Sequence, residues 1–195
     1  MGEDRLQLRA LSLTQPWASL VALGVKRLET RSWQTAHRGP LAIHASWGFP
    51  PSARRLCEEE PFLRLLEGVG LDEDTLPRRA VLGVCRLLGC HLITELEAQR
   101  IAHLGAGEAL HMGGAAVVGV EAALGVRRFG AAVVTRVEAA LGDFGAGRYA
   151  WELSEPRLCR RPSPAPGRLG VWRWETPVNF RDLEPEIAAL LQEGR

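Results

Sequence analysis

The chain has 195 residues, and 24 basic against 23 acidic side chains leave a formal net charge of only +1. This length allows one domain with a sizeable core, while the near-neutral charge excludes recognition of a polyanion through overall charge, so nucleic acid would need a local basic cleft. A charged N-terminus without an apolar run, and no stretch of ~20 apolar residues, predict a cytoplasmic protein without membrane contact.

The first half of the chain predicts strands connected by short helices. Alternating apolar residues and turn residues between them give strand 6–13, helix 14–24, strand 26–33, strand 40–46 and helix 51–68. In the first helix we expect Thr14 near the cap, Pro16 in the first turn and Gly24 as the stop.

The second half predicts a long central strand at 80–94 and two late strands at 147–153 and 170–175. A Pro-rich arm, 156–167, separates the late strands, and residues 181–194 have the pattern of a terminal helix.

A short tandem duplication lies between these elements. "GGAAVVGVEAALG" (113–125) and "GAAVVTRVEAALG" (130–142) match at nine of thirteen positions. Two copies are too few for a solenoid. We interpret them as an insert, at about 98–135, in a surface connection that is helical or partly mobile. A lid or a dimerisation arm is the functional alternative.

Several short strands with few helices, and no regular β-α alternation, predict an α+β domain built round a small barrel. The chain has no Walker loop, which argues against a nucleotide hydrolase. It also has no G-x-S-x-G elbow and no H-E-x-x-H pair, so the hydrolase classes that use these motifs lack support. Four cysteines without a C-x-x-C pair favour buried reduced thiols. We therefore expect no metal and no cofactor.

The segment "GVKRLETRSW" contains the single lysine of the chain, Lys26, whereas the other 23 basic residues are arginine. Lysine can lose its proton and act as a nucleophile or base, which arginine cannot. Glu29 and Arg31 share one face of the predicted strand that follows. The alternative is a solvated strand face with paired charges of little energetic value.

Other polar and aromatic side chains have two interpretations each. His44 and Ser46 share a face of the strand at 40–46, where a hydrogen-bonded core histidine competes with a site residue. Gln15 and Trp17 flank the start of the first helix, where free N–H groups favour anions, although Trp17 also suits a core position.

Two further residues complete the candidate set. Arg38 closes a turn toward the same end of the predicted sheet, where a guanidinium would suit phosphate. Tyr149 shares a face with Trp151 and Leu153, which form either a core or a base-stacking wall.

The order "QPWA", helix, "G-x-K-x-x-E-x-R", "RG-x-L-x-I-H-A-S" resembles the ASCH domain (activating signal cointegrator homology). "LPRRAVLGVCRLLGC", "FGAGRYAWEL" and "PGRLGVWRWE" resemble its later blocks in the same order. The resemblance covers about residues 6–97 and 136–175. It implies an ASCH/PUA-like domain at 1–176, with a PUA-like small β-barrel and flanking short helices, followed by a helical tail at 177–195.

The resemblance also implies a cleft lined by Lys26, Glu29 and Arg31, and a nucleic-acid-related binding module for RNA or a modified nucleotide. A few bacterial relatives hydrolyse the amide of N4-acetylcytidine with a lysine that corresponds to Lys26. This chain has Glu29 where those enzymes have a threonine.

Three functions therefore compete. In a binding module, Arg31 and Arg38 would contact phosphates, Trp17 or Tyr149 would stack a base, and Glu29 would accept from an exocyclic amine. In an amidohydrolase, Lys26 would be the reactive amine and Glu29 would tune its proton. In a protein-interaction module, the insert and the tail would bind partners.

Overall fold

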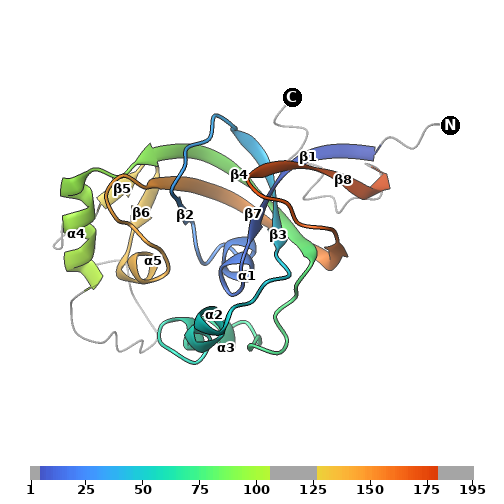
Figure 1. The fold of residues 1–195 in the computed structure, drawn as a ribbon, viewed down its shortest axis with the longest axis horizontal. Helices are drawn as coiled ribbons and strands as arrows, with labels where there is room; N and C mark the ends of the chain where they lie inside the picture. Colours follow the sequence, from blue (N-terminus) through green and yellow to red (C-terminus); the bar gives the residue numbers. More distant parts are fainter. Residues whose placement is uncertain (1–4, 106–126, 180–195) are drawn as a thin grey trace. The chain divides into compact units, whose positions relative to one another are not determined.

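The computed structural model describes residues 5–105 and 127–179 (Figure 1). Its strands are β1 (Arg5–Leu13), β2 (Leu28–Arg31), β3 (Gly39–Ala45), β4 (Ala80–Leu92), β5 (Arg127–Phe129), β6 (Ala132–Val134), β7 (Tyr149–Pro164) and β8 (Val171–Asn179). Its helices are α1 (Trp17–Ala22), α2 (Pro51–Leu56), α3 (Phe62–Glu67), α4 (Glu95–Gly105) and α5 (Arg136–Ala140). The first copy of the duplication and the expected terminal helix lie outside the described residues.

The hydrogen-bonded strand order is β2-β7-β4-β3-β1-β8, with β5 and β6 in a separate hairpin. This mixture of strands and short helices confirms the α+β class, whereas closure into a PUA-like barrel stays a prediction. The chain divides into two compact units. Among the described residues, unit 1 comprises 5–26, 37–88 and 153–179, and unit 2 comprises 27–36, 89–105 and 127–152.

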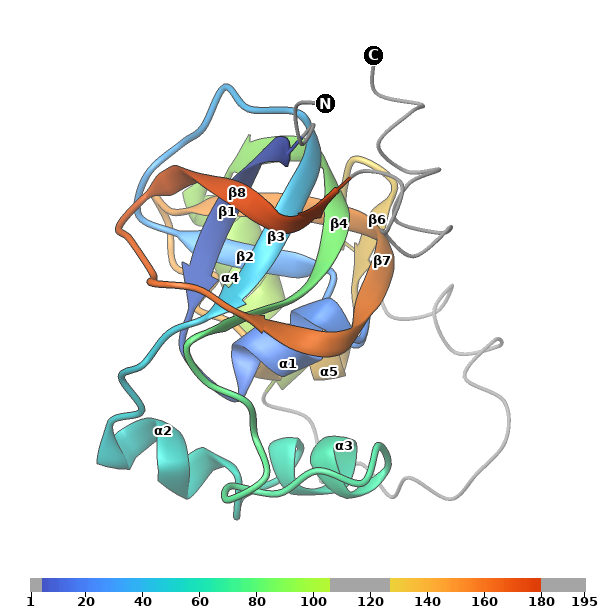
Figure 2. The same cartoon turned by 90° about the vertical axis from the view of Figure 1, so that its right-hand side faces the viewer.

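Unit 1 is built on β1, which pairs in parallel with β3 and antiparallel with β8. Figure 2 shows these three strands side by side. Its core consists of buried apolar residues from segments that are far apart in the sequence: Leu8, Ala10, Ala42, Val81, Val84, Ala165, Trp172 and Trp174. Helix α1 lies between these strands and the α2–α3 pair, and the ring of Trp17 meets that of Phe62 edge-on at 5.8 Å.

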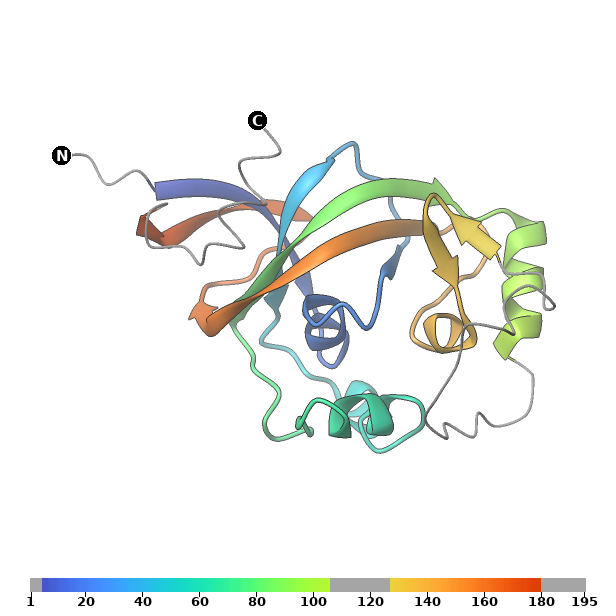
Figure 3. The same cartoon turned by 180° about the vertical axis from the view of Figure 1, so that it is seen from behind.

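Unit 2 contains the β2–β7 pairing, the β5–β6 hairpin and helices α4 and α5 (Figure 3). The second copy of the duplication forms the turn at Gly130, strand β6 and helix α5. Ala132, Val134 and Leu141 of this copy are buried. The expected surface connection is therefore wrong for the second copy, because its apolar residues help to form the core of this unit.

Several element boundaries differ from the prediction for local reasons. The helix at 51–68 is two helices, because Pro61 lacks the N–H that a continuous helix needs. The cap of α1 is Pro16 rather than Thr14, with no side-chain hydrogen bond. Gly24 does follow the helix, with φ +76°, which confirms the predicted stop. The strand predicted at 26–33 is shorter in the structure, where β2 includes only Leu28–Arg31.

Strand β7 continues through most of the arm that we predicted to separate the two late strands. Gly83 of β4 faces this extension, and a Cβ at Gly83 would lie 2.4 Å from the carbonyl oxygen of Arg157. The missing side chain lets the two backbones approach closely, so the arm is paired structure rather than a loop.

None of the helices in the described ranges combines the length and apolarity needed to cross a membrane.

Candidate nucleic-acid interface

Gln15 joins the start of α1 to the loop that precedes β4. Its Nε2 donates to Ser19 Oγ at 2.8 Å and to the Pro77 carbonyl at 2.6 Å, while its Oε1 accepts from the Ser19 N–H at 3.1 Å. Gln15 is fully buried. In the "QPWA" motif this side chain therefore fixes a loop, and a direct ligand contact by Gln15 stays a prediction.

Lys26 follows the turn after α1, and its backbone N–H donates to the Leu20 carbonyl at 3.0 Å. Its side chain is 1% exposed. The single lysine of the chain is therefore almost completely covered, and any ligand role for its amine requires movement of the residues that cover it. Its role as a nucleophile or base stays a prediction.

Glu138 holds the residues directly after Lys26. This buried carboxylate of α5 accepts from the backbone N–H of Arg27 at 3.1 Å and of Leu28 at 2.9 Å. The sequence did not single out this glutamate, although "VEAALG" recurs in both copies of the duplication. Thr135 caps the helix by accepting from the Glu138 N–H, which fixes the start of α5.

In unit 2 the structure brings Glu29, Arg31 and Tyr149 together. Antiparallel pairing sets Arg31 opposite Tyr149 and Glu29 opposite Trp151, so all four residues share one face of the β2–β7 ladder. Arg31 Nε lies 3.2 Å from Glu29 Oε1, and the Arg31 side chain is 25% exposed. On this face Arg31 and Tyr149 are half-buried, whereas Glu29 and Trp151 are buried.

Aromatic rings continue this face. Trp151 is completely buried, and its Nε1 donates to the Trp33 carbonyl at 3.3 Å. The Trp33 ring, which was not among the predicted site residues, meets that of Trp151 edge-on at 4.7 Å. Of the two interpretations of the "GRYAWEL" face, the core one holds for Trp151 and Leu153, while Tyr149 is half-buried.

His44 is a fully buried core histidine in unit 1. Its Nε2 donates to the Ala165 carbonyl at 3.0 Å, which leaves Nδ1 to accept from Ser12 Oγ at 3.1 Å. Ser12 Oγ in turn accepts from Trp172 Nε1 at 3.1 Å. A neutral imidazole satisfies this chain of hydrogen bonds, and burial lowers the pKa of His44 from its ordinary value of 6.5.

This burial predicts a pH dependence of stability. Below about pH 6.5 the unfolded chain takes up a proton at His44 and the folded chain does not, so the free energy of unfolding falls with pH until the folded pKa is reached. Urea denaturation at pH 8, 6.5 and 5 should show this decrease in the wild type and a smaller decrease in His44→Gln. Parallel profiles for the two proteins would contradict the assignment.

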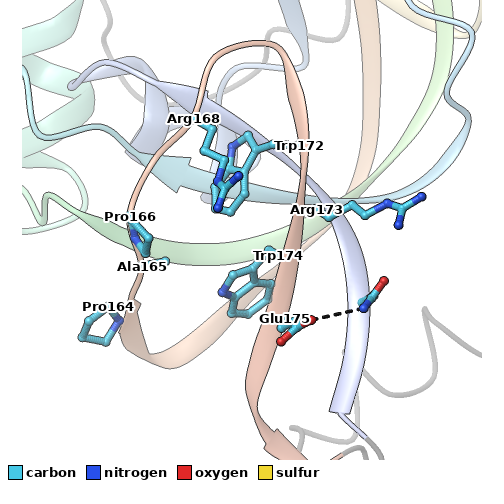
Figure 4. Close-up of a pocket in the computed structure, with 9 residues that line it drawn as sticks. Pro164, Ala165, Pro166, Arg168, Trp172, Arg173, Trp174 and Glu175 are labelled. Atoms are coloured by element: carbon cyan, nitrogen blue, oxygen red, sulfur yellow. Dashed lines mark hydrogen bonds between the residues drawn. The ribbon is translucent and has the colours of Figure 1, made fainter.

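Through Ala165 and Trp172, His44 supports the wall of a pocket of unit 1 of about 550 Å³, drawn in Figure 4. Arg168, Trp172 and Trp174 line this pocket on one side and residues 164–166 on the other. A second pocket, of about 520 Å³, shares residues 164–166 and is lined by Arg78 and Arg79. The two pockets therefore flank one proline-containing wall, which His44 holds through the Ala165 carbonyl.

Ser46 and Arg38 lie in turns of unit 1. The Ser46 N–H donates to the Leu13 carbonyl at 2.8 Å, and its Oγ donates to the Gly48 carbonyl at 3.1 Å. Arg38 is exposed, and its Nη1 donates to the His37 carbonyl at 2.7 Å. Ser46 therefore fixes the turn that carries Trp47, which was not among the predicted site residues although it directly follows the signature "IHAS".

The cysteines are partly as predicted: none forms a disulfide, but Cys90 and Cys159 are half-buried rather than buried. All four are free, Cys57 and Cys85 are buried, and burial raises the pKa of Cys85 to about 12, which keeps it a thiol. Within the described ranges, no group of three or more His, Cys, Asp or Glu side chains could hold a metal ion.

Comparison with known proteins defines the class. The model of the ASCH domain matches residues 11–124, so the chain belongs to the ASCH domain family. The chain is 43% identical over 81 residues to activating signal cointegrator 1 of Mus musculus, and 42% identical over 81 residues to that of Homo sapiens. Each match covers 41% of this chain but only 14% of the relative.

Proposed function

We propose that this ASCH domain binds RNA or a nucleotide through the face of unit 2 that carries Glu29, Arg31 and Tyr149. The observation that supports the proposal is the Arg31–Glu29 pair, at 3.2 Å, on the same strand face as Tyr149. Arg31 can meet a phosphate, Glu29 can accept from an exocyclic amine, and Tyr149 can stack on a base.

Charge explains why such binding must be local. The whole chain has a net charge of +1, so long-range attraction to a polyanion is weak and affinity has to come from fitted contacts. The buried Trp151 lies on this same face and contacts Trp33, which favours a preformed arrangement of the neighbouring polar residues.

The test is isothermal titration of cytidine monophosphate and of a 12-nucleotide RNA at low salt. Arg31→Ala should weaken both about 10-fold, as expected when one charge-assisted hydrogen bond is removed. Glu29→Gln should weaken cytidine monophosphate more than uridine monophosphate, since uridine lacks the exocyclic amine. The matched control is Glu155→Gln, which removes the charge of another glutamate paired with an arginine, Arg86, at 3.3 Å.

Equal affinities in wild type, Arg31→Ala and Glu155→Gln would contradict the site, and no binding of any nucleotide or RNA would contradict the function. Amide hydrolysis by Lys26, which the family resemblance raised, stays a prediction. Chromatography of N4-acetylcytidine after incubation with the wild type and with Lys26→Arg decides it.

A further inference from the structure

Trp47 is the most exposed tryptophan among the described residues of unit 1, at 66%. Two guanidinium groups lie over its ring. The Cζ of Arg78 is 5.6 Å from the ring centroid, and the Cζ of Arg79 is 5.2 Å from it. An indole that is mostly open to solvent and flanked by two cations combines a stacking surface with positive charge.

The backbone of the arginine pair is held in place at both ends. Directly before the pair, the Pro77 carbonyl accepts from Gln15 Nε2 at 2.6 Å, and at its end the Arg79 carbonyl accepts from the Ala165 N–H at 3.0 Å. Arg79 itself has φ +55°, in the left-handed region that arginine seldom adopts. A strained residue fixed by long-range hydrogen bonds is typical of a preformed functional site.

The positive charge of this pair is not neutralised within the described part of the chain. No described carboxylate forms an ion pair with Arg78 or Arg79, and both side chains are exposed. Two of the three acidic residues of the preceding loop have other partners: Asp72 accepts from Thr75, and Glu73 pairs with Arg54 at 2.8 Å. Both guanidinium groups can therefore meet an anion.

Two pockets of unit 1 lie on either side of residues 164–166. The pocket lined by Arg78 and Arg79 shares the wall at residues 164–166 with the pocket of Figure 4. In the pocket of Figure 4, Arg168 and Trp172 lie across from the shared wall. Both pockets therefore carry arginine side chains, and the pocket of Figure 4 adds two tryptophans, which are the groups that bind the phosphates and bases of a single strand.

We propose that Trp47, Arg78 and Arg79 form a second nucleic-acid site, which binds a single strand by stacking one base on Trp47 and by contacting the flanking phosphates with the two arginines. The strand would continue past residues 164–166 toward Arg168. A single strand fits better than a duplex, because a base must be unstacked to lie on the indole. The inference rests on the proposed function in that the ligand is nucleic acid, but its residues belong to unit 1 and are separate from Glu29, Arg31 and Tyr149.

The experiment is fluorescence anisotropy of a 5′-labelled 12-nucleotide RNA of mixed sequence, titrated with the full chain at several salt concentrations. Trp47→Leu should weaken binding about 10-fold, as for removal of one stacking platform, and Trp47→Phe should restore most of it. Arg78→Ala/Arg79→Ala should weaken binding at low salt and reduce the slope of log affinity against log salt by roughly 1.4, about 0.7 for each phosphate that is no longer neutralised.

The matched control is Arg55→Ala/Arg64→Ala, which removes the same charge from arginines on α2 and α3. It should leave a larger part of the affinity than the Arg78/Arg79 variant does. If Trp47→Leu and Arg78→Ala/Arg79→Ala also lose affinity for single-stranded DNA, the site binds a single phosphodiester strand of either kind. If they lose affinity for RNA alone, the site is specific for RNA.

Wild-type affinity in Trp47→Leu, or equal effects of the two double variants, would overturn the second site even if Arg31→Ala still weakened nucleotide binding as expected. In that case the proposed function would stand. Failure of the wild type to bind mononucleotides and every oligonucleotide would instead remove the proposed function and this inference together. Equal losses with a blunt RNA duplex would overturn the stacking role of Trp47.

Discussion

Gly83→Ala is expected to destabilise unit 1 by roughly 3 kcal/mol or more, because the new methyl group would meet backbone rather than a movable side chain. A Cβ at this position would lie 2.4 Å from the Arg157 carbonyl oxygen and 3.2 Å from Leu158 Cα. Strands β4 and β7 would have to separate to make room, which weakens their pairing. Thermal unfolding should show a decrease in Tm of about 6–12 °C.

Gly48→Ala is the control for the loss of glycine itself. A Cβ there would meet nothing within 4 Å, so its Tm should remain close to that of the wild type. If Gly83→Ala and Gly48→Ala had the same Tm, β4 and β7 would not approach each other as closely as the structure requires.

Glu152→Ala is expected to have the second large effect, a loss of about 2–4 kcal/mol in unit 2. The buried Glu152 accepts from the N–H groups of Ala131 at 2.8 Å and Ala132 at 3.2 Å, and its Oε2 lies 3.2 Å from His91 Nε2. Alanine would leave these donors without their acceptor, and the β5–β6 turn would lose its attachment to β7.

Glu152→Gln keeps one acceptor oxygen and should cost less than Glu152→Ala. Glu155→Ala is the control on the same strand, since this carboxylate pairs with Arg86 near the surface and a surface ion pair contributes little. Hydrogen exchange of the Ala131 and Ala132 amides measures the local effect, which should be fast exchange in Glu152→Ala alone. Unchanged protection of these amides in Glu152→Ala would show that other groups hold the turn.

The site itself was only partly predictable. Glu29, Arg31 and Tyr149 were identified from spacing within short segments, and their common face follows from the alternation of strand residues. Trp47, Arg78 and Arg79 were not identified. An exposed tryptophan after a strand and two arginines before another are common in sequences, and only their proximity makes them a candidate site.

The sequence also does not reveal the role of a polar residue whose hydrogen-bond partner is distant in the chain. Gln15 flanks a helix start where free backbone N–H groups favour anions, and the structure shows that its side-chain amide donates to Ser19 and to the Pro77 carbonyl, 62 residues away. For His44 the sequence left open a core histidine or a site residue. Its hydrogen bond to the Ala165 carbonyl, 121 residues away, supports the core histidine. No local pattern encodes such partners.

The sequence by itself determined the α+β class, most strand positions, the stop of α1 at Gly24 and membership of the ASCH domain family. These depend on the period of apolar residues, on the freedom of glycine at positive φ, and on a motif of short spacing. The tertiary structure alone decided that Lys26 is covered, that β7 extends through the Pro-rich arm, and that Trp47 meets Arg78 and Arg79. The physical reason is that burial and side-chain partners depend on strand order and register, which bring together segments that are far apart in the chain.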